Sequence, residues 1–320
     1  MQSIVRIIAA LLAMRRYRNH RAGPALAHLG TALALGVACV TPPAAAQAIG
    51  AADLHDAPSL LARYAELTPQ LQKNQFQRPL VLQSTESAAS LKGDIYAVLD
   101  YPFATVSTAF NGPDHWCDML ILHLNTKYCR AVSQNGKNQL QVNVGKKHDQ
   151  ALADAYRVNF NLAVAASTPD YLDVVLSARD GPMGTSDYRI LLQAVALPNG
   201  RTFMHLTYSY AYGLAARIAM KAYLSTVGSE KVGFTRTPGG GDAQYIGGVR
   251  GVVERNTMRY YLAIDAYLSA LGVAEPQQLE RRLQTWFAAT ERYPRQLHEV
   301  SRDEYIEMKR SETQRQRAPQ

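Results

Sequence analysis

The feature that most constrains this fold is an alternation of apolar and polar residues that recurs in four successive segments. They are residues 156–164, 172–176, 188–194 and 204–212. Alternation with a period of two places every second side chain on the same face of a β-strand. Turns rich in Pro, Gly, Asn and Asp separate the segments. Four such strands joined by short turns predict an antiparallel meander with one covered face.

Shorter elements precede the meander. A strand over residues 94–100 leads into a helix over 102–110, and a second short helix begins at Pro113. Proline suits the first turn of a helix because its missing N–H has no intrahelical partner there. The dipeptide Asn135-Gly136 lies between two further strand-like runs and predicts a β-hairpin.

Helical periodicity appears on both sides of this β-region. The longest helix is expected over residues 249–271, which carry an apolar stripe. The other expected elements are a helix over residues 53–76 interrupted at Pro69, a short strand over 79–82, a helix over 213–227, and a C-terminal helix that carries Leu279, Leu283, Trp286 and Phe287. The charged tail after Pro294 is expected to be frayed.

The N-terminal segment has the composition of a secretory signal. The first 48 residues contain five arginines and no Asp or Glu. A basic patch is followed by a short apolar run over residues 31–40 and by the A-x-A sequence Ala46-Gln47-Ala48. Together they predict a cleavable signal peptide that is cut between Ala48 and Ile49. A retained N-terminal membrane anchor is the alternative, but the apolar run is shorter than the roughly 20 residues that a spanning helix needs.

Cleavage at this site changes the charge. It removes five of the 34 basic residues and none of the 26 acidic ones, which leaves a net charge of +3. So small a surplus argues against a nucleic-acid partner. The mature chain is expected to be soluble and periplasmic or secreted. Peripheral contact with a membrane stays open, and the sequence does not constrain the oligomeric state.

Two cysteines remain after cleavage, Cys117 and Cys129. In an oxidising compartment two cysteines twelve residues apart are expected to form a disulfide. The alternatives are two unpaired structural thiols, or a catalytic thiol next to His115 or His123. No sequence signature supports the catalytic thiol, which would need a depressed pKa and an orienting group.

The order of elements, a strand, two short helices, six antiparallel strands and a long helix, resembles the START-like superfamily of helix-grip, polyketide-cyclase and lipid-transfer proteins. The most suggestive local sequences run from Asp94 to Val106 and from Asn111 to Trp116. The resemblance covers residues 91–271 and leaves helical extensions over 49–90 and 272–320. It implies an α+β fold in which a curved antiparallel sheet of about seven strands grips a long C-terminal helix.

This resemblance also implies an apolar cavity between sheet and helix that binds a lipid, a sterol or a polyketide-like molecule. Tyrosines at equivalent strand positions are candidates for its wall, where their hydroxyls would orient the ligand. Ordinary packing in a solid core is the alternative for these residues. The expected ligand-binding residues are Tyr156, Phe160, Tyr188, Met204, Tyr208, Tyr210 and Tyr260.

Other motifs are weak. The glycines of residues 228–248 lack the phosphate-loop pattern, and the histidines lack metal-ligand spacing, so no cofactor and no metal are expected. The glycine-rich segment interrupts the long helical region and predicts a mobile flap at the cavity mouth. Arg157 and His205 alternate with the apolar set and should face away from the cavity. Binding without catalysis is therefore favoured over a cyclase-type or hydrolase-type enzyme, and over a structural envelope protein with a solid core.

Overall fold

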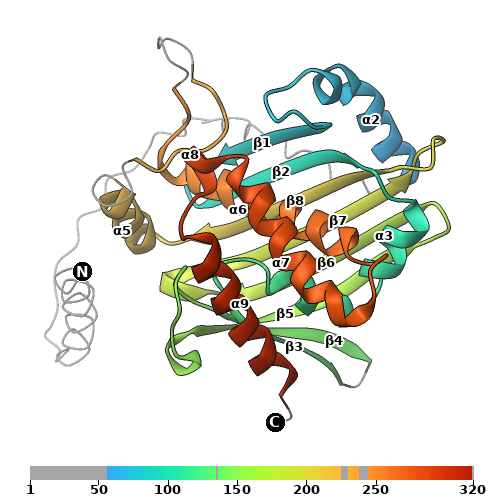
Figure 1. Ribbon diagram of the computed structural model, residues 1–320. Helices are drawn as coiled ribbons and strands as arrows, with labels where there is room; N and C mark the ends of the chain where they lie inside the picture. Colours follow the sequence, from blue (N-terminus) through green and yellow to red (C-terminus); the bar gives the residue numbers. More distant parts are fainter. Residues whose placement is uncertain (1–55, 135, 225–229, 238–243, 319–320) are drawn as a thin grey trace, which may run out of the picture. The chain divides into compact units, whose positions relative to one another are not determined.

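The computed structural model describes residues 56–134, 136–224, 230–237 and 244–318 (Figure 1). The expected signal segment and its cleavage site lie outside the described residues. The described part belongs to one compact unit, Ala52–Gln320. Within it, no helix combines the length and the apolar character that crossing a membrane requires.

Eight antiparallel strands form a single sheet in the order β1-β2-β8-β7-β6-β5-β4-β3. The strands are β1 (Leu80–Glu86), β2 (Ser90–Leu99), β3 (Thr126–Gln134), β4 (Lys137–Val144), β5 (Tyr156–Ser167), β6 (Tyr171–Asp180), β7 (Thr185–Ala196) and β8 (Thr202–Tyr212). The expected meander is β5 to β8, and the expected hairpin is β3–β4. The sheet has one strand more than the seven expected because β1 extends it beside β2.

The helices are α2 (Ala57–Gln72), α3 (Phe103–Phe110), α4 (Asp114–Leu120), α5 (Leu214–Leu224), α6 (Gly248–Ser269), α7 (Glu275–Glu291), α8 (Pro294–Leu297) and α9 (Arg302–Arg317). Asp56 caps α2 by accepting a hydrogen bond from the Ser59 backbone N–H at 2.8 Å. Contrary to expectation, α2 continues through Pro69, since it ends only three residues later and little helix is left to disrupt.

Helices cover both faces of the sheet. On β2, Ile95 and Ala97 point into the main core under α6, whereas Tyr96 and Val98 point to a second core. This second core is completed by Leu60, Leu67 and Leu71 of α2. The period-two alternation of the strands therefore separates two apolar layers, and α6, α7 and α9 lie over the face opposite to α2 (Figure 1).

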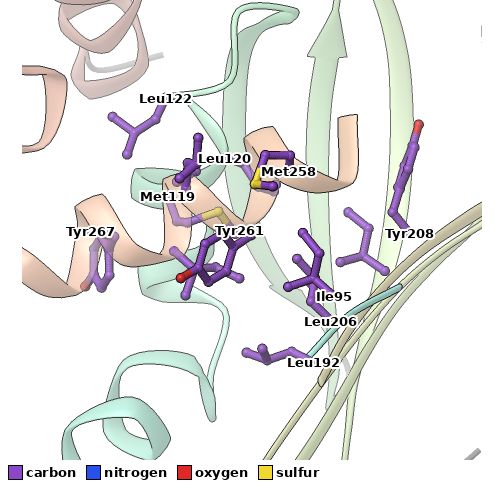
Figure 2. Packing of buried hydrophobic residues seen from close by; sticks show 14 of the residues in the cluster. Ile95, Met119, Leu120, Leu122, Leu192, Leu206, Tyr208, Met258, Tyr261 and Tyr267 are labelled. Carbon is purple, nitrogen blue, oxygen red and sulfur yellow. The ribbon is translucent and has the colours of Figure 1, made fainter. Parts of the chain in front are cut away.

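Helix α6 comes very close to the sheet at Gly93 of β2. A Cβ atom at this position would collide with the Thr257 hydroxyl and approach Val253 to 3.5 Å. The sheet can therefore hold α6 tightly here only because residue 93 has no side chain. Figure 2 shows the continuous packing that results, with Met258 and Tyr261 of α6 close to Ile95 and Leu206 of the sheet.

The expectation of a frayed C-terminal tail is wrong. Residues 302–317 form α9, whose Tyr305 is fully buried and stacks on Trp286 of α7 at 4.8 Å between ring centroids. The Tyr305 hydroxyl donates a hydrogen bond to the Leu122 carbonyl at 3.0 Å. A charged sequence is ordered here because a narrow apolar stripe, together with a buried ion pair, faces the domain.

Candidate functional site

A nearly enclosed cavity of about 60 Å³ lies between α6 and the β4–β8 half of the sheet. Its wall consists of Leu120, Thr126, Val142, Val144, Val158, Phe160, Pro182, Tyr188, Ile190, Tyr208 and Tyr260. Alternate residues of β4, β5, β7 and β8 supply the sheet side, and Tyr260 supplies the helix side. One end is closed by Leu120, the last residue of α4, and Thr126, the first residue of β3. The cavity thus lies where the START-like resemblance places a ligand.

Aromatic rings dominate the wall. The Tyr208 ring lies 5.2 Å from that of Tyr260 and 6.3 Å from that of Tyr188. Phe160 meets Tyr188 edge-on at 6.4 Å, and Tyr210 stacks on the other side of Tyr188 at 5.2 Å. In Figure 2 the Tyr208 hydroxyl lies at the end of the ring farthest from the packed aliphatic side chains. These rings hold α6 and the sheet apart and leave space between them.

The hydroxyl groups of this cluster differ in their partners. Tyr188 shares a hydrogen bond of 2.8 Å with the Thr185 hydroxyl. Among the described residues, no hydrogen bond is made by the hydroxyls of Tyr208, Tyr210 or Tyr260. Burial raises the pKa of each of these three tyrosines above its ordinary value. They therefore stay protonated at neutral pH and keep their capacity to donate and accept hydrogen bonds.

The cavity is small for the ligands that the fold suggests. A volume of about 60 Å³ corresponds to roughly two water molecules at liquid density. Pockets for drug-sized or lipid-like ligands measure about 300–1,000 Å³. In this conformation the protein's own side chains fill most of the site, so a larger ligand requires part of the wall to move.

Exposed apolar side chains mark the end of the cavity near Pro182. The next residue, Met183, is 80% exposed and adopts a positive φ of 55°. Helix α5 packs against this turn and exposes Leu214 (73%) and Ile218 (61%), and Tyr156 of β5 is 43% exposed. We call Tyr156, Met183, Leu214 and Ile218 the apolar rim. Large exposed apolar side chains near a cavity are typical of a binding surface.

The structure places the expected ligand-binding residues in four different surroundings. Phe160, Tyr188, Tyr208 and Tyr260 line the cavity. Tyr210 supports the wall from behind Tyr188, and Tyr156 belongs to the apolar rim. Met204 is fully buried in the solid part of the core, where it pairs with Ala97 and Ala194 across the sheet. Position along the strand separates Met204 from the cavity, although it has the same phase as Tyr208.

Several wall residues were not predicted. Leu120 is the last residue of α4 and Thr126 is the first residue of β3, and at the ends of such short elements no periodicity indicates which side chains turn inward. Val142, Val144 and Val158 have the correct phase on their strands, but valine carries no polar group that would single it out. Wall residues of this kind can be identified only when the pairing register of the strands is known.

The expected disulfide is present. Cys117 of α4 and Cys129 of β3 are bonded, with their Cα atoms 5.1 Å apart. Both cysteines are buried. The bond joins the two ends of the segment that carries Leu120 and Thr126, so it fixes the end wall of the cavity. A disulfide is typical of an oxidising compartment.

The glycine-rich segment does not border the cavity where it is described. Residues 230–237 lie along α6, where the Glu254 carboxylate accepts hydrogen bonds from the backbone N–H groups of Phe234 (2.5 Å) and Thr235 (2.9 Å). Glu254 is fully buried and also accepts from the Ser84 hydroxyl at 2.6 Å. The described part of this segment is therefore anchored at the β1 edge, away from the mouth at which a flap was expected, and residues 225–229 and 238–243 lie outside the described residues.

His205 faces away from the cavity, as its strand phase predicts. Its Nε2 atom lies 2.9 Å from Asp94 Oδ1, and its Nδ1 atom lies 3.0 Å from Gln193 Oε1. Tyr96 stacks on the imidazole at 4.3 Å. Burial acts to raise the pKa of Asp94, but the hydrogen bond from His205, together with Lys92 and Thr207, holds this pKa below its ordinary value. The network therefore belongs to the α2 side of the sheet and is no part of the cavity wall.

Larger hollows on the surface do not compete with this cavity as a ligand site. A hollow of about 340 Å³ beside α2 is lined largely by polar and charged residues such as Gln72, Asn74 and Arg78. Another of about 360 Å³ runs along the β1 edge. Neither is enclosed between the sheet and α6. In the part of the chain that the structure describes, no group of three or more His, Cys, Asp or Glu side chains is placed to hold a metal ion.

No protein-family model matches the chain, and no curated protein matches it in sequence. Solved structures that are similar include a conserved protein from Geobacillus kaustophilus, with 11% identity over 56% of this chain and 95% of that one and a TM-score of 0.34. A norcoclaurine synthase point mutant from Thalictrum is 9% identical over 45% of this chain and 86% of its own, with a TM-score of 0.31. Human StAR-related lipid transfer protein 5 is 8% identical over 74% of this chain and 97% of its own, with a TM-score of 0.29.

Likeness at these scores carries no argument about ligand or activity. The fold is recognised from the arrangement of its elements. A strand is followed by two short helices, six sequential antiparallel strands and a long helix that packs across the sheet. At the level of the fold, this chain is START-like.

Proposed function

We propose that this protein is an exported carrier that binds a hydrophobic small molecule, such as a lipid, a sterol or a polyketide-like compound, without catalysis. The observation that carries the proposal is the enclosed cavity between sheet and α6, with Tyr208 and Tyr260 in its wall. Their hydroxyls have no partner within the described residues, and such groups favour a ligand that offers a hydrogen bond inside an apolar site.

The composition of the wall favours binding over chemistry. Among the residues that the structure describes, no Asp, Glu, His, Lys or Cys lines the cavity. The tyrosine pKa values are raised, whereas a general acid or base works best with a pKa near the working pH. The pair Asp94–His205 lies on the opposite face of the sheet. A cyclase-type or hydrolase-type mechanism thus has no acid–base group at the site.

Ligand binding in this proposal requires the cavity to open. The turn around Met183 and helix α5 are the parts best suited to move, because they expose apolar side chains and contribute little to the core. Displacing them would join the cavity to the apolar rim. The rim would then contact the ligand, and the exposed apolar area there would become covered.

One observation favours a second candidate. A cavity of about 60 Å³ is compatible with a structural protein of the cell envelope whose core holds no ligand, because most of the space is already filled. In that case the apolar rim would be covered by another protein. Binding measurements distinguish the two candidates.

Export rests on two features. The N-terminal 48 residues have the composition of a signal peptide, and the disulfide Cys117–Cys129 suits an oxidising compartment. We expect the mature chain to begin at Ile49. Intact-mass analysis of protein recovered from the periplasm or the medium tests this, and a mass that still includes residues 1–48 would contradict it.

Binding can be tested with N-phenyl-1-naphthylamine, a neutral probe that fluoresces in apolar sites. We expect the parent protein to bind it and Val158→Phe to abolish binding, because the larger ring fills the cavity. Val164→Phe is the matched control, since Val164 lies on the same strand but is exposed. Failure of the parent protein to bind the probe, with no ligand in its organic extract by mass spectrometry, would favour the structural candidate.

A further inference from the structure

The interior behind the cavity wall carries an unusual excess of positive charge. Lys127 of β3 and Lys309 of α9 are both fully buried and share one carboxylate, that of Glu312, at 2.9 Å and 2.7 Å. Burying a charge is costly unless it is paired. Two ammonium groups with a single carboxylate leave one positive charge uncompensated by a side chain.

A second cluster of cations adjoins the first. Arg259 of α6 is buried and pairs with Glu299 at 2.8 Å, and the same carboxylate also binds Lys147 and Lys231. Three cations thus share this carboxylate. Across both clusters, five cationic side chains face two carboxylates.

His123 lies where these cations meet the cavity. Its ring stacks on Tyr260, a wall residue, at 4.8 Å, and its backbone carbonyl accepts a hydrogen bond from Lys309 at 2.7 Å. Lys309 also donates to the carbonyl of Thr126, another wall residue, at 2.8 Å. The Tyr260 ring and the main chain of Thr126 thus lie between the cavity and this positive region.

Two buried donors in this region lack partners among the described residues. His123 Nδ1 accepts a hydrogen bond from the Asn125 backbone N–H at 3.1 Å, which leaves Nε2 as the N–H of a neutral ring. His123 Nε2 and Arg259 Nε are buried and make no hydrogen bond. Burial, with the charges of Arg259, Lys309, Lys147 and Lys127, lowers the pKa of His123 well below its ordinary value. Orphaned donors in a positive environment favour an acceptor that carries negative charge.

We propose that the ligand of the cavity is an anionic amphiphile, a lipid-like molecule with a carboxylate, whose charged group is held at the His123 end behind Tyr260. This inference rests on the proposed function and specifies the ligand class of the same site. Rotation of the Tyr260 ring would bring the carboxylate to His123 Nε2, while the apolar chain would lie against Phe160 and Tyr208. The carboxylate compensates the buried positive charge, and the rest of the ligand needs no polar contact.

The experiment compares two molecules that differ only in the head group. Dodecanoate and 1-dodecanol are used to displace N-phenyl-1-naphthylamine from the mature protein at pH 7. A charge-assisted hydrogen bond in a buried positive site predicts that dodecanoate binds at least about tenfold more tightly. Equal affinities, or tighter binding of the alcohol, would overturn the inference and leave the proposed carrier function intact. If the parent protein does not bind the probe, the function itself fails.

Variants locate the head group. His123→Phe keeps an aromatic ring against Tyr260 but removes the N–H, so the preference for dodecanoate should fall below about threefold while the affinity for dodecanol stays unchanged. His115→Phe, at an exposed histidine, is the matched control and should keep the preference. If His123→Phe does not fold, Lys147→Met removes a positive charge of the same region at a partly exposed position and should lower the preference for dodecanoate. A preference unchanged in every folded variant of His123 and Lys147 would overturn the placement.

Discussion

The two sides of helix α6 meet the sheet in opposite ways. On the side of β1 and β2, Thr257 packs directly on Gly93 and the buried Glu254 ties α6 to Ser84. On the side of β8, the rings of Tyr260 and Tyr208 meet at 5.2 Å and hold helix and sheet apart. One helix thus contacts the sheet closely along one side and spans a cavity along the other. We call these the closed side and the cavity side.

This difference shows how a helix-grip fold can be stable and still keep internal space. A glycine and a short hydroxyl side chain allow close approach, and buried hydrogen bonds fix it. Tyrosines fill width but leave gaps, because rigid rings cannot adapt to every contour. Stability is expected to come from the closed side and ligand binding from the cavity side. Substitutions that are matched across α6 test this division.

The largest effect is expected from the disulfide that fixes the cavity end. Replacing Cys117 and Cys129 with Ala reopens a loop whose ends are twelve residues apart, which should lower the free energy of unfolding by about 3 kcal/mol in the chain-entropy model. Urea denaturation with and without reductant measures the loss. If the reduced and oxidised proteins are equally stable, the end wall does not depend on the cross-link.

On the closed side, Gly93→Ala should cost about 2 kcal/mol, because the new methyl group collides with the Thr257 hydroxyl. Gly112→Ala is the control, since a Cβ atom there meets nothing within 4 Å. Adding Thr257→Ala to Gly93→Ala should restore part of the stability, because it removes the colliding hydroxyl. Additive losses in the double variant would show that the two residues do not touch.

Removing one tyrosine hydroxyl in a packed region and one on the cavity side compares the two regions. Tyr305 donates to the Leu122 carbonyl in the packed region between α9 and α4, so Tyr305→Phe should cost about 1–2 kcal/mol by leaving that carbonyl unpaired. Tyr208→Phe should change stability by less than about 0.5 kcal/mol, because the Tyr208 hydroxyl has no hydrogen-bond partner among the described residues. Thermal melting of both variants measures the contrast. Equal losses would mean that the Tyr208 hydroxyl is bonded in solution.

The closed side was easier to predict from sequence than the cavity side. Strand alternation and the apolar stripe of residues 249–271 indicated the meander and α6, because burial of one face imposes a period. The disulfide was predicted from the cysteine count and the signal-like N-terminus. The role of Gly93 was not predicted, because nothing in the sequence says which helix residue lies above a given glycine.

The site was predicted only in part. Strand phase selected Phe160 and Tyr208, which line the cavity, but it also selected Met204, which does not. Phase says which face of the sheet a residue occupies and not how far along the strand the cavity extends. The buried lysines of α9 and β3 were missed for a different reason. A helix rich in charge was interpreted as frayed, whereas Lys309 and Glu312 are buried because each neutralises part of the other's charge.

A pH dependence of stability is also expected, and it arises from the positive region behind the cavity side. Burial lowers the pKa of Lys309 from 10.5 to about 8, and the neighbouring Lys127 acts in the same direction against the attraction of Glu312. Between pH 8 and about pH 10 the unfolded chain holds a proton on this lysine that the folded protein has released. The unfolded state therefore binds more protons, and stability should rise with pH across this window. Burial lowers the pKa of Lys147 to about 8 as well, and this lysine adds a contribution of the same sign.

This window ends near pH 10, where the tyrosines of the unfolded chain begin to lose their protons while buried ones such as Tyr208 keep theirs. The folded protein then binds more protons, so stability should fall as the pH rises further. Urea unfolding at pH 7, 8, 9 and 10 measures the slope. Lys309→Met should be less stable overall, because it leaves Glu312 and two carbonyl groups short of a donor, yet its stability should rise less between pH 8 and pH 10. Lys137→Met, at an exposed position of β4, should keep the parent slope. If the parent protein instead loses stability from pH 8 to pH 9, the buried lysines hold their protons in this range and the predicted pH dependence is wrong.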